Sequence, residues 1–136
     1  LRFTDSSVPP EYHRSWELRI DSEATVSTVT DYEEVLDEGS VSTDPEAWQD
    51  FLDALPGLVD DAESADGDPA DCAGGTTLVI AVYDAGPGEV SRARADEISE
   101  TTVGGCGGGE VIDEVLSAVT PLAEPTGLPG EARTWP

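Results

Sequence analysis

The chain has 136 residues and a net charge of −24, which comes from 30 Asp and Glu against six Arg, with no lysine. A chain of this length forms one ordinary domain around a single core. The charge argues against nucleic acid as a partner, because affinity for a polyphosphate backbone depends on clustered Lys and Arg. The longest apolar run, from Leu78 to Tyr83, is too short to cross a bilayer, so we expect no membrane insertion by this chain.

Two strands separated by a loop are predicted at the start of the chain. Residues 1–5 place Leu1 and Phe3 on one parity, and the two prolines of SSVPP at 6–10 then prevent regular pairing because they lack an amide donor. Residues 12–20, YHRSWELRI, alternate apolar and polar side chains, which is the period-two pattern of a half-buried strand.

Extended structure is predicted to continue to about residue 42. β-branched residues dominate ATVSTVTD at 24–31, where Val26 and Val29 fall on opposite parities and permit a bulge. The segment YEEVLDEGSVS at 32–42 also favours an extended conformation.

The segment STDPEAWQDFLDALPGL predicts the first helix. Thr43 or Asp44 can cap it, Pro45 fits its first turn, and a glutamate stands three residues after Thr43, as a capping box requires. Its apolar residues recur at steps of three and four. The Pro-Gly pair at 56–57 should end or distort the helix. The small, acidic residues at 59–75 then predict a long surface loop.

The second half of the chain predicts a hairpin and a second helix. TTLVIAVYD at 76–84 is apolar on both parities, so we expect it at the centre of the sheet. VSRARADEIS should return as its partner, with Arg92 and Arg94 pointing outward. GEVIDEVLSAVTPL repeats the helical pattern and is expected to end at Pro121.

Together these elements predict an α+β fold. We expect residues 1–122 to form one domain, in which an antiparallel sheet of four to five strands carries two helices on one face and one disulfide staples the fold. Residues 123–136 are rich in proline and lack periodicity, so they are expected to form an irregular tail.

The segment TTVGGCGGGEV at 101–111 sets one cysteine among five glycines. A phosphate-binding loop is disfavoured because the P-loop pattern needs a lysine and the chain has none. A reactive thiol at Cys106 would need a base, and His13, the only histidine, lies on the polar side of its predicted strand. Structural zinc sites want four Cys or His ligands, and this chain has three in total.

A disulfide between Cys72 and Cys106 is the preferred hypothesis over two free thiols, because they are the only two cysteines in a chain that looks exported. By the loop-entropy argument the bond would stabilise the fold by roughly 3.8 kcal/mol. The flanking glycines would then let the backbone approach and turn. We therefore expect an extracellular or cell-envelope location.

Acidic residues offer only weak candidates for a metal or catalytic site. Asp66, Asp68 and Asp71 supply oxygens at short spacing, as calcium prefers, but the EF-hand order is absent and a solvated charge run explains them better. A pair of catalytic carboxylates cannot be singled out among 30 acidic residues. No cofactor is indicated.

The element order and the segment VTDYEEVLDEGSVSTDPEAWQDFLDAL resemble small exported actinobacterial lipoprotein-type domains and, more distantly, the emfourin-like inhibitors of thermolysin-type proteases. The resemblance covers roughly residues 1–122. It implies an α+β domain that binds a protein and has no chemistry of its own. It assigns no inhibitory contact, and the two cysteines and the acidity depart from the inhibitor pattern.

The sequence therefore predicts a non-enzymatic, exported or surface-tethered interaction domain with another protein as its partner. An emfourin-like metalloprotease inhibitor and an enzyme that uses carboxylates or Cys106 remain the alternatives. Two loops are the expected binding surfaces. Their candidate residues are Ser6, Ser7, Val8, Pro9 and Pro10 in the first loop, and Asp60, Asp61, Asp66, Asp68 and Asp71 in the second.

Overall fold

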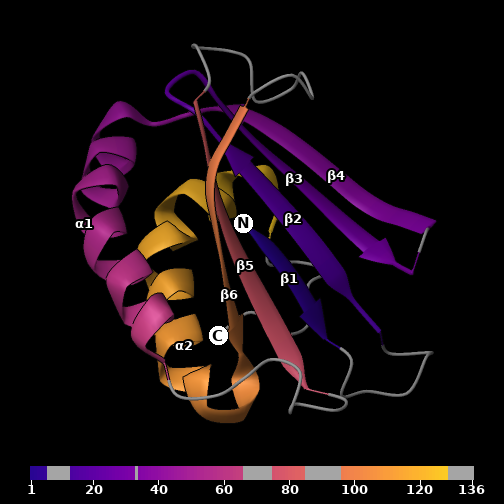
Figure 1. Cartoon of the computed structure of the whole chain (residues 1–136). Helices are drawn as coiled ribbons and strands as arrows, with labels where there is room; N and C mark the ends of the chain where they lie inside the picture. Colours follow the sequence, from indigo (N-terminus) through magenta and orange to yellow (C-terminus); the bar gives the residue numbers. More distant parts are fainter. Residues whose placement is uncertain (6–12, 33, 66–74, 85–95, 129–136) are drawn as a thin grey trace.

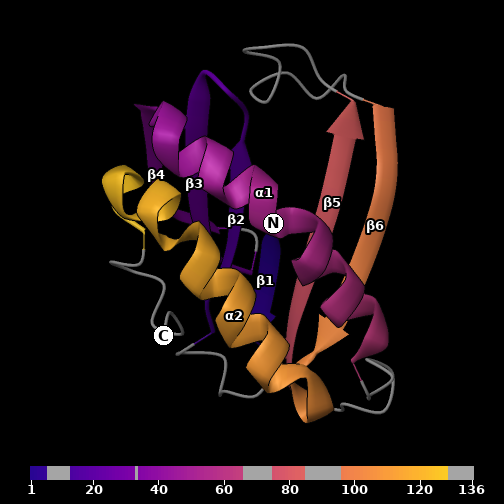
Figure 2. The same ribbon diagram turned by 90° about the vertical axis from the view of Figure 1, so that its left-hand side faces the viewer.

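The computed structural model describes residues 1–5, 13–32, 34–65, 75–84 and 96–128. Within these residues the chain forms one antiparallel sheet of six strands, in the order β4-β3-β2-β1-β5-β6, with two long helices on one face (Figures 1 and 2). The predicted α+β class is confirmed, whereas the predicted count of four to five strands was too low. The elements are β1 (Arg2–Asp5), β2 (Ser15–Ile20), β3 (Ala24–Asp31), β4 (Glu34–Ser42), α1 (Pro45–Ser64), β5 (Thr76–Asp84), β6 (Asp96–Gly104), α2 (Gly105–Ala123) and the 3-10 helix η3 (Glu124–Thr126).

One row of buried side chains crosses five of the six strands. Strand pairing places Val29, Trp16, Phe3, Leu78 and Val103 side by side from β3 to β6. All five are at most 2% exposed. The rings of Phe3 and Trp16 are stacked with their centroids 5.5 Å apart. The row confirms the alternation predicted for residues 12–20, and it defines the sheet face that the helices cover.

Strand β5 is interior but does not lie at the centre of the sheet, as its apolar sequence suggested. It pairs with β1 on one side and with β6 on the other, antiparallel in both cases. β1 itself inserts between β2 and β5, and this insertion moves β5 toward the edge. The hairpin predicted for β5 and its successor is present. Arg92 and Arg94 lie outside the described residues.

Helix α1 begins at an aspartate cap. The Asp44 side chain accepts hydrogen bonds from the backbone amides of Glu46 and Ala47, at 3.1 and 2.9 Å, and Pro45 occupies the first turn. The Thr43 hydroxyl is instead hydrogen-bonded to the Thr25 hydroxyl at 2.9 Å, in a buried position. The expected capping box therefore does not form, because its threonine is used to bind β3.

Helix α1 continues through Pro56 to Ser64, so the long loop predicted from residue 59 was wrong over its first six residues. Leu58 and Ala62 extend the buried stripe of the helix beyond the proline. Burial of these two side chains offsets the hydrogen bond that Pro56 cannot make. Residues 66–74 of that predicted loop lie outside the described part of the chain.

Strand β6 and helix α2 share the glycine-rich segment. Residues 101–104 complete β6, and α2 starts at Gly105, although Cys106 and Gly107 depart from helical geometry. Gly107 has a φ of 121°, which only glycine adopts readily. The helix also runs past Pro121 to Ala123, because Leu122 and Ala123 are buried. Among the described helices, none is long and apolar enough to span a membrane.

The chain beyond α2 packs back onto the sheet. Thr126 of η3 and the following Leu128 are buried, at 8% and 2% exposure. Thr126 lies directly over Gly39 of β4, where a β-carbon would collide with the Thr126 carbonyl oxygen. Residues 123–128 are therefore ordered, although the division of the chain at residue 122 stays a prediction and residues 129–136 are not described.

Replacing Gly39 with alanine should lower the free energy of unfolding by about 1–3 kcal/mol, the usual cost of overpacking. Gly57→Ala is the matched control, because no described atom outside the adjacent helix backbone lies within 4 Å of the position its new β-carbon would take inside α1. That change should raise the free energy of unfolding by about 0.5–1 kcal/mol. Urea unfolding followed by tryptophan fluorescence measures both, and equal effects of the two changes would contradict the close approach at Gly39.

Candidate functional site at the β3–β4 hairpin

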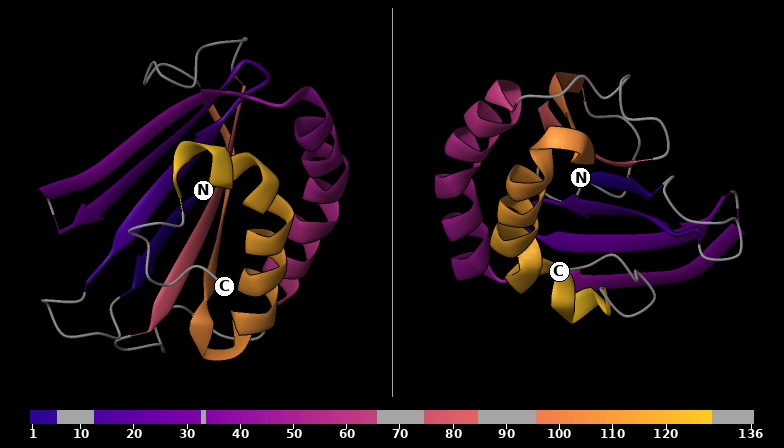
Figure 3. Two further views of the ribbon diagram at one scale, coloured as in Figure 1. Left: turned by 180° about the vertical axis from the view of Figure 1, so that it is seen from behind. Right: turned by 90° about the horizontal axis from the view of Figure 1, so that it is seen from below.

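The helices do not cover the first half of β4. Helix α2 packs against β6, β5 and β3, whereas η3 is the described helix with the main contact to β4, near Gly39. Residues 34–38 are all exposed, although successive side chains of a strand point to opposite faces. Figure 3 shows β3 and β4 extending away from the helices. This end of the hairpin therefore presents both faces of a strand to solvent.

Apolar side chains gather at this uncovered end. Tyr32, Val35 and Leu36 are 60%, 57% and 38% exposed. Among the described residues, Tyr83 on β5 is the one other large apolar side chain with comparable exposure. A cluster of large exposed apolar side chains marks an interaction surface more often than isolated ones do. We refer to Tyr32, Val35 and Leu36 as the hairpin cluster.

A bulge in β4 shapes the hairpin cluster. Val35 pairs with Thr30 and Asp37 pairs with Val29, so Leu36 is the extra residue of β4 at this point. Val35 consequently shares the face of Thr30, which is opposite to the buried side chain of Val29. A bulge was predicted within residues 24–31, from the opposite parities of Val26 and Val29. These residues instead pair in unbroken register, and the irregularity lies between Val29 and Thr30, with its extra residue on β4. It increases the local twist of the exposed edge.

Tyr32 lies at the tip of the hairpin in an unusual backbone conformation. Its φ is 52°, in the left-handed region that Asn, Asp and Gly adopt more readily in hairpin turns. The Tyr32 ring stacks on the His13 ring, with centroids 4.5 Å apart and planes 10° from parallel. This stacking holds a strained and exposed tyrosine in one place.

Asp31 connects the tip to the start of β2. One carboxylate oxygen of Asp31 lies 3.8 Å from His13 Nδ1 and the other lies 3.7 Å from an Arg14 amino group. The side chains of His13 and Arg14 are each 12% exposed. His13 is therefore largely buried, contrary to its predicted exposure, because the Tyr32 ring covers it. The exposed tip thus contacts two largely buried side chains, His13 and Arg14, through Tyr32 and Asp31.

Carboxylates surround the hairpin cluster. Glu34, Asp37 and Glu38 are exposed, and none of them forms an ion pair with a described residue. No group of three or more metal-ligating side chains occurs in the described part of the chain. The arrangement has the features of a contact surface, with apolar groups at its centre and unpaired negative charge around them.

Of the ten residues predicted to form a binding surface, the structure describes Asp60 and Asp61, so that surface stays a prediction. Asp60 and Asp61 are exposed on α1 rather than in a loop. Residues 6–10, with Ser6, Ser7, Val8, Pro9 and Pro10, and the aspartates Asp66, Asp68 and Asp71 lie outside the described residues. So does Cys72. Cys106 is exposed at the start of α2, and no described cysteine is a free thiol.

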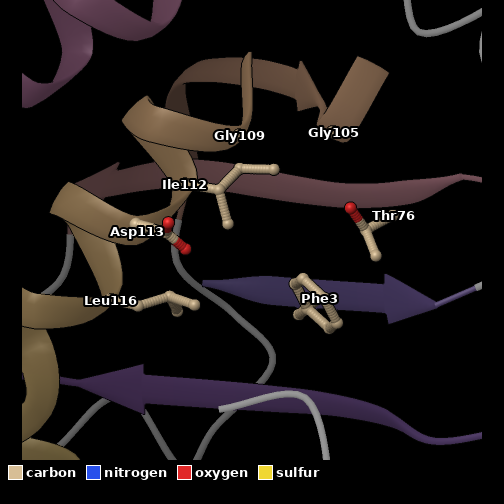
Figure 4. A pocket seen from close by; sticks show the side chains of 7 residues that line it. All are labelled: Phe3, Thr76, Gly105, Gly109, Ile112, Asp113 and Leu116. Carbon is tan, nitrogen blue, oxygen red and sulfur yellow. The ribbon is translucent and has the colours of Figure 1, made fainter. Parts of the chain in front are cut away.

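A hollow of about 190 Å³ lies where the start of α2 meets β1 and β5. Figure 4 shows Phe3, Ile112 and Leu116 around it, with Asp113 at its side. Asp113 is the single ionisable side chain among the described residues that line it. A pair of carboxylates, or a nucleophile beside a base, is the usual core of an acid–base or acyl-transfer site. The hollow contains neither arrangement among its described residues.

Comparisons of this chain with family models, with curated proteins and with solved structures gave no match. The resemblance to lipoprotein-type and emfourin-like domains therefore stays a prediction.

The hairpin cluster was not identified from the sequence, which assigned residues 32–42 only as extended. A signal was nevertheless present: Val35 and Leu36 are adjacent and therefore fall on opposite parities, with acidic residues on either side. A strand with this pattern has no purely apolar face to bury. The edge of a sheet accommodates such a strand more readily than its centre does.

We predict that Tyr32→Gly is more stable than Tyr32→Ala by about 1 kcal/mol, because both remove the stacked ring and glycine alone relieves the left-handed backbone. At an ordinary strand position the order is reversed, since glycine costs about 0.5–1 kcal/mol relative to alanine. Urea unfolding of the two variants gives the difference directly. An alanine variant as stable as the glycine variant would show that residue 32 does not need a positive φ.

Proposed function

We propose that this protein is a non-enzymatic interaction domain that binds another protein through the exposed end of the β3–β4 hairpin. One observation supports this more than any other: the row of buried side chains that crosses the sheet ends at Val29, and its next position, on β4, is the exposed Asp37. The first half of β4 therefore does not contribute to the core. Its exposed Val35 and Leu36 have no role in folding that the described contacts reveal.

The anchoring of the tip supports the same proposal. Ordering a flexible loop on binding costs free energy, so a surface that is already fixed binds more tightly for the same contacts. Asp31, His13 and Tyr32 fix the hairpin before any partner arrives. Strained residues that the surrounding structure holds in place are common at such functional positions.

We further propose that the protein works outside a reducing cytosol, with Cys72 and Cys106 joined in a disulfide. The absence of a free thiol at the described Cys106 supports this pairing, since Cys72 is the only other cysteine in the chain. The bond would tie the start of α2 to the segment before β5. It would stabilise the β5–β6 side of the sheet, which lies across the sheet from β4.

A metalloprotease inhibitor of the emfourin type is a narrower form of the same proposal. It would use protein binding alone, and the hairpin would be the segment that contacts the protease. Inhibition assays with thermolysin test this form, and the absence of inhibition would remove it while leaving the wider proposal intact. An enzyme that uses carboxylates remains the less supported alternative, because Asp113 stands alone among the described residues of the hollow.

The double variant Val35→Ser/Leu36→Ser is expected to weaken binding by at least about tenfold, because it removes the two apolar anchors of the proposed surface. The ligands are peptides selected against the wild-type protein from a displayed library of random short sequences. Titration calorimetry measures affinity, and circular dichroism confirms that the variant is folded.

Tyr83→Ser is the matched control, since Tyr83 is also exposed and apolar but lies on β5. It should leave peptide affinity unchanged. Peptides that bind the double variant as tightly as wild type, or that perturb backbone NMR signals of α1 and not of β4, would refute the proposed surface.

The disulfide makes a separate prediction. Alkylation of the unfolded, non-reduced protein should label no cysteine in a mass spectrum, and the paired replacement Cys72→Ser/Cys106→Ser should lower the free energy of unfolding by roughly 2–4 kcal/mol. Labelling of both cysteines without reduction would contradict the proposed bond.

A further inference from the structure

We propose that the partner of this protein is an extended, basic peptide segment that adds to the sheet as a seventh strand, along the first half of β4. This inference rests on the proposed function and specifies how the hairpin binds and what it selects. It is carried by three observations on residues 31, 32 and 34–38: a backbone edge that no described strand pairs with, apolar side chains on an uncovered strand, and carboxylates without ionic partners among the described residues. The Asp37 carboxylate accepts a hydrogen bond from the neighbouring Glu38 amide.

The backbone of β4 has an unused side. β4 pairs with β3 on one side, and no described strand pairs with it on the other. In an antiparallel pair, alternate residues direct their amide and carbonyl groups away from the neighbouring strand. A second extended chain can accept these groups, and this is the usual mode of peptide recognition at a sheet edge. The first half of β4 is therefore a template for one more strand.

The opposite edge of the sheet is a poorer template. β6 is also paired on one side only, but α1 and α2 both pack against it. Its side chains at Thr101 and Val103 are buried, and those at Ser99, Glu100 and Thr102 are exposed and polar. Among residues 99–104 of that edge, where the side chains are described, no large apolar side chain is exposed. The hairpin cluster distinguishes β4 from β6.

Charge determines which chain can add to β4. Glu34, Asp37 and Glu38 lie within the same five residues as Val35 and Leu36 and have no ionic partners among the described residues. A second copy of this protein would bring identical carboxylates opposite these, and like charges directly opposite each other on paired strands are destabilising. The net charge of −24 adds a long-range repulsion between copies.

A segment with Lys or Arg alternating with apolar residues would satisfy both features. Its basic side chains would share the face of Glu34 and Asp37, and its apolar side chains would share the face of Val35, where Glu38 stands at the far end. Electrostatic attraction would also steer such a segment toward an acidic domain. The carboxylates therefore disfavour self-association and favour a partner segment that carries positive charge.

The test uses peptides selected from a displayed library of random short sequences against the folded wild-type protein. We expect Lys and Arg to be enriched in the selected peptides relative to the starting library. The triple variant Glu34→Gln/Asp37→Asn/Glu38→Gln should bind them about tenfold more weakly, and high salt should weaken wild-type binding. Glu63→Gln/Glu110→Gln/Glu114→Gln, at exposed positions of α1 and α2, removes the same charge and should retain wild-type affinity.

Strand addition is tested by blocking the peptide backbone. Two versions of one selected peptide carry N-methyl groups on odd or on even residues, so that each version loses one set of amide donors. Strand addition requires one version to lose binding and the other to retain it, because only one set of donors faces β4.

The outcomes separate this inference from the proposed function. Some selected peptides could depend on Val35 and Leu36 and yet show no enrichment in Lys and Arg, no loss of affinity for the triple variant, or equal binding of both methylated versions. Any of these results would overturn strand addition by a basic segment and leave the hairpin as the binding surface. Peptides indifferent to Val35 and Leu36 would refute both. A dimer of the wild-type protein in sedimentation at physiological ionic strength, absent in Val35→Ser/Leu36→Ser, would assign the edge to a second copy and overturn the inference.

Discussion

The fold depends on one continuous row of buried side chains across the sheet. Val29, Trp16, Phe3, Leu78 and Val103 occupy successive positions on β3, β2, β1, β5 and β6. Helix α2 lies over this row, and its own Val115, Leu116 and Val119 are almost completely buried. Two helices can cover only a limited width of sheet. The edge strand β4 therefore lies partly outside the core. Its second half is covered where Gly39 lets η3 approach, and its first half is left open.

The first half of β4 and the hairpin tip have features that a strand edge without a function would not need. The tip is fixed by a stacked histidine and by a carboxylate close to two nearly buried side chains. Large apolar side chains remain exposed although the chain is otherwise strongly acidic, and they do not belong to the core of the described residues. The acidity that keeps the protein soluble also makes self-pairing of this edge unfavourable. Solubility and partner selection thus have the same physical origin.

Much of the fold could be predicted from local patterns. The alternation in YHRSWELRI identified the face of β2 that carries Trp16 and Leu18, and Asp44 followed by Pro45 identified the start of α1. Boundaries set by tertiary contacts could not be predicted. Pro56 and Pro121 indicate helix ends locally, yet both helices continue because residues beyond each proline are buried. The position of β5 depends on which distant strand pairs with it, and no local pattern contains that information. The candidate site could not be predicted for a similar reason. Whether Val35 is exposed depends on which strands the two helices cover, and this is known only from the structure.

Amide hydrogen exchange in β4 tests the central claim most directly, because it reports whether the edge of the free protein is available. In the protein alone, alternate amides within residues 34–38 should exchange rapidly, while those bonded to β3 should be protected. The rapidly exchanging amides should become protected when a selected peptide is bound. Slow exchange of every amide of residues 34–38 in the free protein would show that this edge is already occupied, and would contradict the account.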